Sequence, residues 1–217
     1  MSFVRLAGAA GVMFAAIVLV INVALAAAKW PLDGDATPGE VARYFADHTG
    51  LLGLDVSLAL VNVLLIAVFG AGVFAVVWPR ERQRDEAWSV VGVIGVAVMT
   101  ALFSAVVAAR AALLGGHDPA GGLFDLHNAL FTAVGIGLAL ILIGFSVGGL
   151  RTATIRRWHG VLGLISGGLL TVSAMLTPVR SPGGLAIIGA VGFLGWLVWL
   201  PTYGVVLMRA RAATVVE

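Results

Sequence analysis

The sequence contains no cysteine. This absence excludes disulfide bonds, thiolate metal sites, iron–sulfur clusters, covalently attached c-type haem and thiol redox chemistry. Of the 13 basic residues only Lys29 is a lysine, so no late helix carries the lysine that a retinal Schiff base requires. The chain also lacks a pair of facing histidines within its apolar segments, a P-loop and a nucleotide-binding glycine motif. Neither haem b nor a nucleotide is therefore expected, and no cofactor is predicted.

Charged residues are scarce as well. They make up 11% of the 217 residues and hydrophobic residues make up 60%, whereas a soluble globular domain is roughly 25% charged. A soluble core of this size would not bury so much apolar surface, so the lipid bilayer is the expected solvent and partner. The net charge is +2, but the basic residues lie in short clusters between apolar runs. This pattern is typical of membrane topology and does not indicate nucleic acid as a partner.

Six apolar segments follow one another along the chain. About 20 apolar residues at 1.5 Å per residue span the roughly 30 Å of the bilayer core. The first run is longer than the 7–15 or so residues typical of a signal peptide, which favours a retained helix. We therefore predict an all-α, polytopic membrane protein with six transmembrane helices in one domain over residues 1–217. The predicted helices cover residues 3–28, 51–78, 88–114, 127–150, 160–179 and 185–208.

The first loop, residues 29–50, contains a short amphipathic helix. Thr37 is a plausible N-cap, Pro38 occupies the first helical position and Glu40 the third, which is a capping-box pattern. Val41, Tyr44 and Phe45 then fall on one face. We expect this helix to lie on the membrane surface.

The arginines fix the expected orientation. Most of them lie on the side of the amino terminus, and the positive-inside rule then places both termini in the cytoplasm and residues 29–50 outside the plasma membrane. The arginines on the inner side are Arg5, Arg80, Arg82, Arg84, Arg151, Arg156, Arg157, Arg209 and Arg211. The other side has Lys29, Arg43 and Arg180.

Ionisable residues gather at the outer mouth. Counted from the inner end of each helix, Asp55, Arg110 and His127 all lie about 33–36 Å along, at the outer edge of the hydrocarbon. Asp125 and Asn128 flank His127, and Asn62 lies on the same face as Asp55 about 10 Å further in. These six residues are the candidate ligand pocket. Further ionisable groups on the outer loops are His48, His117 and Asp118.

This cluster has several interpretations. It could bind a metal through histidine and carboxylates, bind an anionic headgroup through Arg110, or hold an acid/base pair in Asp55 and His127. The structural alternative is that Asp125 caps its helix, Asp55 pairs with Arg110, and the histidines lie in the wet interface. Asp-x-His is not a specific metal motif, so no metal site is predicted.

Other polar and small residues have structural interpretations beside functional ones. Asn22 and Asn62 fit interhelical hydrogen bonds or a polar path. The pairs Gly144/Gly148 and Gly163/Gly167 fit close packing of the helices over 127–150 and 160–179, or a homodimer face.

Aromatic and basic residues mark the ends of the later segments. Trp199 and Tyr203, near Trp196, fit an interfacial aromatic belt, with an aromatic lining for a lipid or quinone as the alternative. His159, beside Arg156 and Arg157, is expected to contact solvent or lipid headgroups.

Two passages, PGEVARYFADHTG and GFSVGGLRTATIRRWHGVLGLISGGLL, carry a resemblance. With the apolar helix that follows the first, they resemble the first outer loop and the fourth-to-fifth helix hairpin of an uncharacterised family of bacterial six-helix membrane proteins. The resemblance implies the six-helix fold and brings no activity.

We expect a non-enzymatic module that binds a small molecule, a lipid or a partner protein at its outer mouth. The alternatives are an enzyme acting on a lipid or isoprenoid, with Asp55 and His127 as acid and base, and a small transporter. The partner is a ligand, a second copy of the chain or another membrane protein.

Overall fold

The computed structural model describes residues 2–30, 36–116, 122–176 and 184–210. These residues form seven helices and, within those ranges, no strand. The helices are α1 (Phe3–Ala27), α2 (Pro38–Asp47), α3 (Thr49–Arg82), α4 (Trp88–Leu114), α5 (Gly122–Arg151), α6 (Arg157–Leu176) and α7 (Gly184–Arg209). All except α2 are long and apolar enough to cross a membrane. The predicted all-α fold with six spans and a short amphipathic helix is confirmed, and the chain is a multi-pass membrane protein.

The helix boundaries differ from the prediction by four residues or more at two places. Helix α5 begins at Gly122 rather than at residue 127, so the polar group around His127 lies inside the first turns of the helix. An acidic residue in a first turn, here Asp125, interacts favourably with the helix dipole. Helix α3 continues through Pro79 to Arg82, beyond the predicted end at residue 78.

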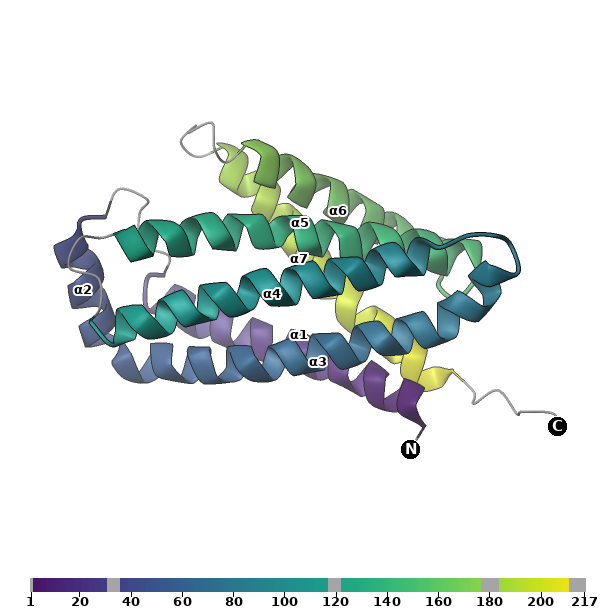
Figure 1. Cartoon of the computed structure of the whole chain (residues 1–217), viewed down its shortest axis with the longest axis horizontal. Coiled ribbons are helices and arrows are strands. Elements are labelled where there is room, and N and C mark those ends of the chain that lie inside the picture. The colour runs from purple at the N-terminus through teal and green to yellow at the C-terminus, as the bar shows by residue number, and fades with distance from the viewer. Residues whose placement is uncertain (1, 31–35, 117–121, 177–183, 211–217) are drawn as a thin grey trace.

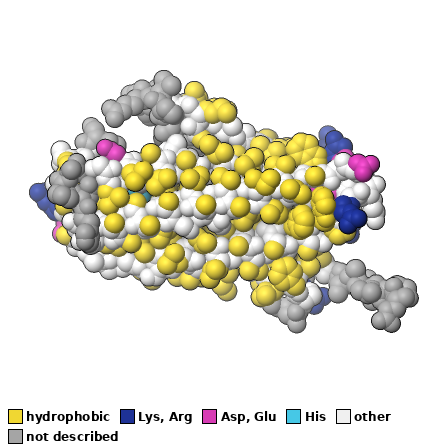
Figure 2. Space-filling view, viewed as in Figure 1, with side chains coloured by type: hydrophobic (Ala, Val, Ile, Leu, Met, Phe, Trp, Pro, Cys, Tyr) yellow, Lys and Arg dark blue, Asp and Glu magenta, His cyan; other side chains and the backbone are white. Residues whose placement is uncertain are grey.

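The six spanning helices form a ring. Each span packs against the next along the chain, and α7 returns to pack against α1. Helix α2 lies across one end of the bundle and both chain termini lie at the opposite end (Figure 1). We call these the α2 end and the termini end. Figure 2 shows hydrophobic side chains along the flank and charged side chains gathered at the two ends, as a bilayer requires.

The capping box of α2 is confirmed. The Thr37 hydroxyl accepts from the backbone N–H of Glu40, and the Glu40 carboxylate accepts from the backbone N–H of Thr37 at 2.8 Å. The apolar face of α2 does not lie in lipid. Val41, Tyr44 and Phe45 are buried in a cluster that includes Ile21, Leu25, Leu52, Leu113 and Phe124, from the ends of four helices. Lys29, with φ of 60°, and the bond from Trp30 N to Leu25 O turn the chain back onto that end.

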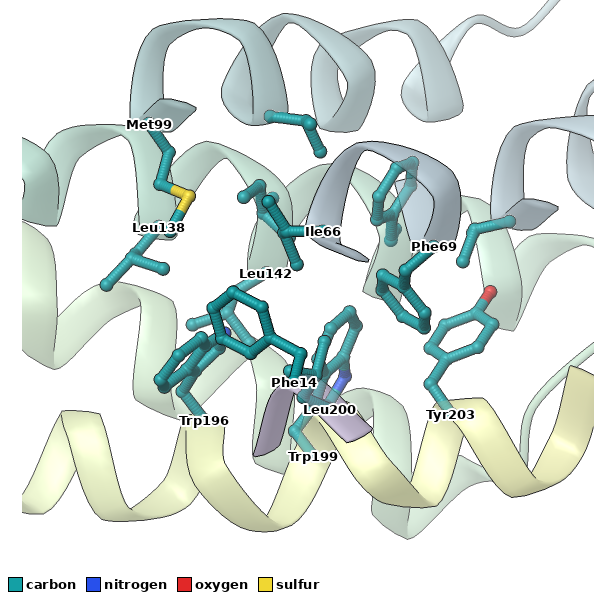
Figure 3. Packing of buried hydrophobic residues seen from close by; sticks show 14 of the residues in the cluster. Phe14, Ile66, Phe69, Met99, Leu138, Leu142, Trp196, Trp199, Leu200 and Tyr203 are labelled. Atoms are coloured by element: carbon teal, nitrogen blue, oxygen red, sulfur yellow. The ribbon is translucent and has the colours of Figure 1, made fainter. Parts of the chain in front are cut away.

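The ring is filled near the termini end by an aromatic core (Figure 3). Trp196, Trp199 and Tyr203 of α7 are 2%, 0% and 0% exposed, so the predicted interfacial aromatic belt is wrong. His159 is only 1% exposed, which corrects its predicted contact with solvent or headgroups. Its Nε2 donates to the carbonyl of Trp199 at 2.9 Å. This bond ties the start of α6 to the part of α7 around Pro201.

Glycines set the close approaches of the ring. A side chain at Gly163 or Gly167 would meet α5, as predicted for the hairpin of α5 and α6. Gly144 and Gly148 instead face α4 and α3, on the side of α5 that is turned away from α6. At the termini end, a Cβ on Gly204 would lie 2.6 Å from the carbonyl oxygen of Gly8. Helices α1 and α7 therefore cross closely there, and they diverge toward the α2 end (Figure 1).

Candidate functional site

A buried ion pair lies at the α2 end of the ring. Arg110 on α4 donates to the carboxylate of Asp55 on α3, and the two side chains are 7% and 8% exposed. The helical rise predicted that these residues lie at one level of the membrane, and in the structure they are in contact. Each charge is neutralised by the other, so the pair adds no net charge to its surroundings.

His127 extends this pair into a hydrogen-bonded chain. Arg110 Nη2 lies 3.1 Å from His127 Nε2, and because a guanidinium can only donate, Nε2 is the acceptor. The proton of the neutral ring is then on Nδ1, which donates to Asn128 Oδ1 at 3.1 Å. Both ring nitrogens of His127 are thus occupied by bonds that hold Arg110 and the ring in place.

Trp30 covers the polar cluster. The guanidinium carbon of Arg110 lies 5.3 Å from the centroid of the Trp30 ring, a cation–π contact. Trp30 also packs edge-on against His127, with ring centroids 5.8 Å apart. Its ring contacts that of Tyr44 of α2 at a tilt, with centroids 5.5 Å apart. The sequence gives one signal for this role of Trp30. It is an aromatic residue that follows the first span, at the same expected level as Arg110.

Tyr44 brings α2 into the same group. Its hydroxyl oxygen is buried and has no hydrogen-bond partner among the described residues. Burial raises the pKa of Tyr44, and the positive charge of Arg110 opposes that rise. The phenol therefore stays neutral next to the ion pair.

A cavity of about 550 Å³ lies inside the ring below this cluster. All six spanning helices contribute to its wall, which is mostly apolar. Asp55 and Arg110 line it toward the α2 end, while Phe14 and Trp196 line it toward the aromatic core. Asn62 lies on the wall between them, two helical turns below Asp55.

Three residues of the cavity wall each carry a buried polar atom that lacks a partner in the described parts of the chain. The atoms are Asn62 Oδ1, Arg110 Nε and Trp196 Nε1. A buried polar group without a hydrogen bond costs about 1–3 kcal/mol. Native proteins leave few such groups, and here three of them belong to residues around one cavity.

The cavity reaches the outer surface of the bundle. Asn22, Phe131 and Ala190 line it and are exposed, and they come from α1, α5 and α7. Phe131 is 53% exposed. Asn22 Nδ2 donates to the carbonyl of Val18 in its own helix at 2.8 Å, so the interhelical bond predicted for Asn22 is not formed. The opening therefore lies on the apolar flank, where the spans of the protein face lipid.

The remaining predicted residues lie outside the cavity. Asp125 is exposed in the first turn of α5 and does not line the cavity, because its position on α5 turns it away from His127. The Asn128 side chain is connected to the polar cluster through its hydrogen bond with His127.

The ring of His48 stacks on Tyr44 with centroids 4.3 Å apart, and His117 and Asp118 lie outside the described residues. Among the residues that are described, no three His, Asp or Glu side chains come together as a metal site would require.

One buried ionisable residue was not predicted. Glu81 is 0% exposed, although it follows the predicted helix end at residue 78 in a highly charged stretch. Its carboxylate accepts from the backbone N–H of Ser89 at 3.0 and 3.1 Å and from the Ser89 hydroxyl. Ser89 is in the first turn of α4, and a carboxylate at a helix N-terminus is stabilised by the unpaired N–H groups there.

No protein family, curated protein or solved structure matches this chain. The resemblance to a bacterial six-helix family therefore stays a prediction.

Proposed function

We propose that this membrane protein is a non-enzymatic binding module for an uncharged, lipid-like alcohol. One observation carries the proposal: Asn62, Arg110 and Trp196 line the same cavity, and each has a buried polar atom without a partner among the described residues. A bound ligand that satisfies them offsets the cost of burying them.

The three atoms define the chemistry of the ligand. Asn62 Oδ1 requires a donor, whereas Arg110 Nε–H and Trp196 Nε1–H require acceptors. A hydroxyl group has one donor and also accepts, so it can donate to Asn62 and accept from one of the other two. Because Asp55 already neutralises Arg110, a charged headgroup would leave an excess charge in a buried site. An uncharged ligand is favoured for that reason.

The cavity also fits the rest of such a ligand. A volume of about 550 Å³ falls within the range of about 300–1,000 Å³ of small-molecule sites. The wall is mainly apolar, and the opening at Phe131 and Ala190 lies on the apolar flank. A ligand with a hydrocarbon body can therefore enter from the bilayer without crossing water.

The same geometry disfavours the two alternatives. To act as an acid or base, His127 would need a free ring nitrogen, yet Arg110 and Asn128 occupy both, and Arg110 holds Asp55 in an ion pair. A transporter would need a polar path through the ring. Toward the termini end, the ring is filled by the aromatic core around Phe14 and Trp196 (Figure 3).

The arrangement of charge supports an orientation. Arginines concentrate at the termini end, which favours a plasma-membrane protein with both termini in the cytoplasm. The α2 end and the opening of the cavity then belong to the outer leaflet, where the ligand would be collected.

Native mass spectrometry of the full chain in detergent tests this function. The probes are a C20 isoprenoid alcohol, its phosphate ester and the parent hydrocarbon. We expect the alcohol to bind with a one-to-one stoichiometry and to exceed the other two by about tenfold, the value of one to two buried hydrogen bonds. Equal retention of the hydrocarbon, or preference for the phosphate, would contradict the proposal.

Matched variants make the test specific. Asn62→Leu and Trp196→Phe each remove one unpartnered polar group, and each should weaken alcohol binding by about fivefold to tenfold. Asn22→Leu is the control, because Asn22 lines the cavity but bonds within its own helix. If Asn22→Leu weakened binding as much as Asn62→Leu, the polar contacts would not be the determinants.

A further inference from the structure

A second cavity lies at the termini end. It has a volume of about 800 Å³, opens on the surface, and is formed by the end of α3, the turn at residues 152–156, the start of α6 and the end of α7. Arg80, Arg156 and Arg209 all line it, one from each of three separate segments. We call this cavity the arginine groove.

The charge of the arginine groove is not compensated. Among the described residues no Asp or Glu lines it, and none of its three arginines forms an ion pair. Two carboxylates at this end are engaged elsewhere, since Glu81 accepts from Ser89 and Glu86 pairs with Arg151 at 2.7 Å. The groove therefore presents a net positive field to any ligand.

The groove is ordered by hydrogen bonds of its own. Arg80 Nη1 donates to the carbonyl of Val76 and to Thr154 Oγ1, both at 3.3 Å. Thr152 Oγ1 donates to the carbonyl of Gly148 at 2.8 Å, so in the 2.8 Å contact between the two threonine hydroxyls Thr154 is the donor. These bonds fix the turn at 152–156 and hold Arg80 against it.

We propose that the arginine groove binds the headgroup of an anionic phospholipid, such as phosphatidylglycerol. Its phosphate lies among Arg80, Arg156 and Arg209. Lipid is favoured over a soluble phosphate by the surroundings of the groove. Trp158, at its rim, is 53% exposed, as is typical of an aromatic residue at the bilayer interface. Val76, Val205 and Val206 also line it and offer an apolar surface to the acyl chains.

The test compares lipids and matched arginine variants on the full chain in detergent, by native mass spectrometry with phosphatidylglycerol or phosphatidylcholine added. An arginine near an anionic lipid surface is worth about fivefold in affinity. The groove variant Arg80→Gln/Arg156→Gln/Arg209→Gln should therefore lose on the order of 100-fold in phosphatidylglycerol affinity. The control Arg5→Gln/Arg82→Gln/Arg157→Gln removes the same charge from exposed arginines at this end that do not line the groove. It should change affinity by less than about threefold.

The outcomes separate the explanations. Equal losses in both triple variants would mean that the total charge at this end attracts lipid, and would overturn the groove assignment. Saturable binding of inorganic phosphate that is lost in the groove variant and competes with phosphatidylglycerol would assign the site to a soluble phosphate compound, which also overturns it. The single variant Arg156→Gln keeps the test valid if the triple variant misfolds, since that side chain makes no hydrogen bond or ion pair with the described residues. A phosphatidylglycerol affinity unchanged in Arg156→Gln would then refute the proposal.

Discussion

The ion pair of Asp55 and Arg110 gives the sharpest prediction about what holds this bundle together. We consider Asp55→Asn, Arg110→Met and the double variant. Removing one member of a buried pair leaves the other charge uncompensated and costs about 3–5 kcal/mol. Removing both members removes that penalty. The double variant is therefore expected to be more stable than either single variant.

The two single variants should differ. Asp55→Asn keeps an acceptor beside Arg110 and is expected to cost about 3 kcal/mol, at the lower end of that range. Arg110→Met also leaves His127 Nε2 without its donor and removes the contact with Trp30. These losses add about 1–3 kcal/mol and about 1 kcal/mol respectively. Arg110→Met should consequently be the most destabilised of the three variants.

Reversible unfolding in mixed micelles, followed by tryptophan fluorescence, measures all three free energies of unfolding. A coupling energy of about 2 kcal/mol or more is expected for neighbours in one buried network. Polar pairs in membrane proteins average only about 0.6 kcal/mol in such cycles. A coupling at or below that average would refute the argument, because it would mean that water or lipid headgroups solvate the pair despite its burial.

Three further predictions concern the α2 end and the ring. Trp30→Ala should increase proteolysis within residues 36–48 and weaken the hold on Arg110, whereas Trp30→Phe should keep most of the packing. The pKa of Glu40 is lowered by its hydrogen bonds with Thr37, so the capping box stabilises α2 fully above the unfolded pKa of 4.5 and is lost as pH falls through the folded pKa. Hydrogen exchange of α2, corrected for intrinsic rates, should show this loss on acidification, and Glu40→Gln should remove the pH dependence. Gly204→Val should lower the melting temperature by several degrees, because the new side chain would overpack the crossing of α1 and α7.

The depth of each polar residue could be predicted from the sequence because the rise of a helix is fixed. That regularity is why Asp55, Arg110 and His127 were expected at one level and are found in one hydrogen-bonded chain. Depth alone did not identify which neighbouring residues belong to this hydrogen-bonded chain. Asp125 is only two residues from His127, and yet it faces away from the site.

The rotation of each helix could not be predicted. In a soluble protein apolar residues mark the buried face, but in a membrane both faces of a helix are apolar. Leu64 is 68% exposed to lipid and Ile66, two residues later, is 0% exposed. The same ambiguity hid the burial of His159 and Trp199, whose surroundings are set by helices distant in the sequence.

The closure of the ring between α1 and α7 also determines the order in which the protein can be assembled during synthesis. A chain made from its amino end completes the ion pair with α4 and adds His127 with α5. The wall of the cavity requires Trp196 on α7, which follows the other five spans in the chain. Until α7 is made, α1 has an unpaired flank, and Gly8 has no partner for its close crossing. Truncation before α7 should therefore yield an inserted protein that keeps the polar cluster but has no enclosed cavity.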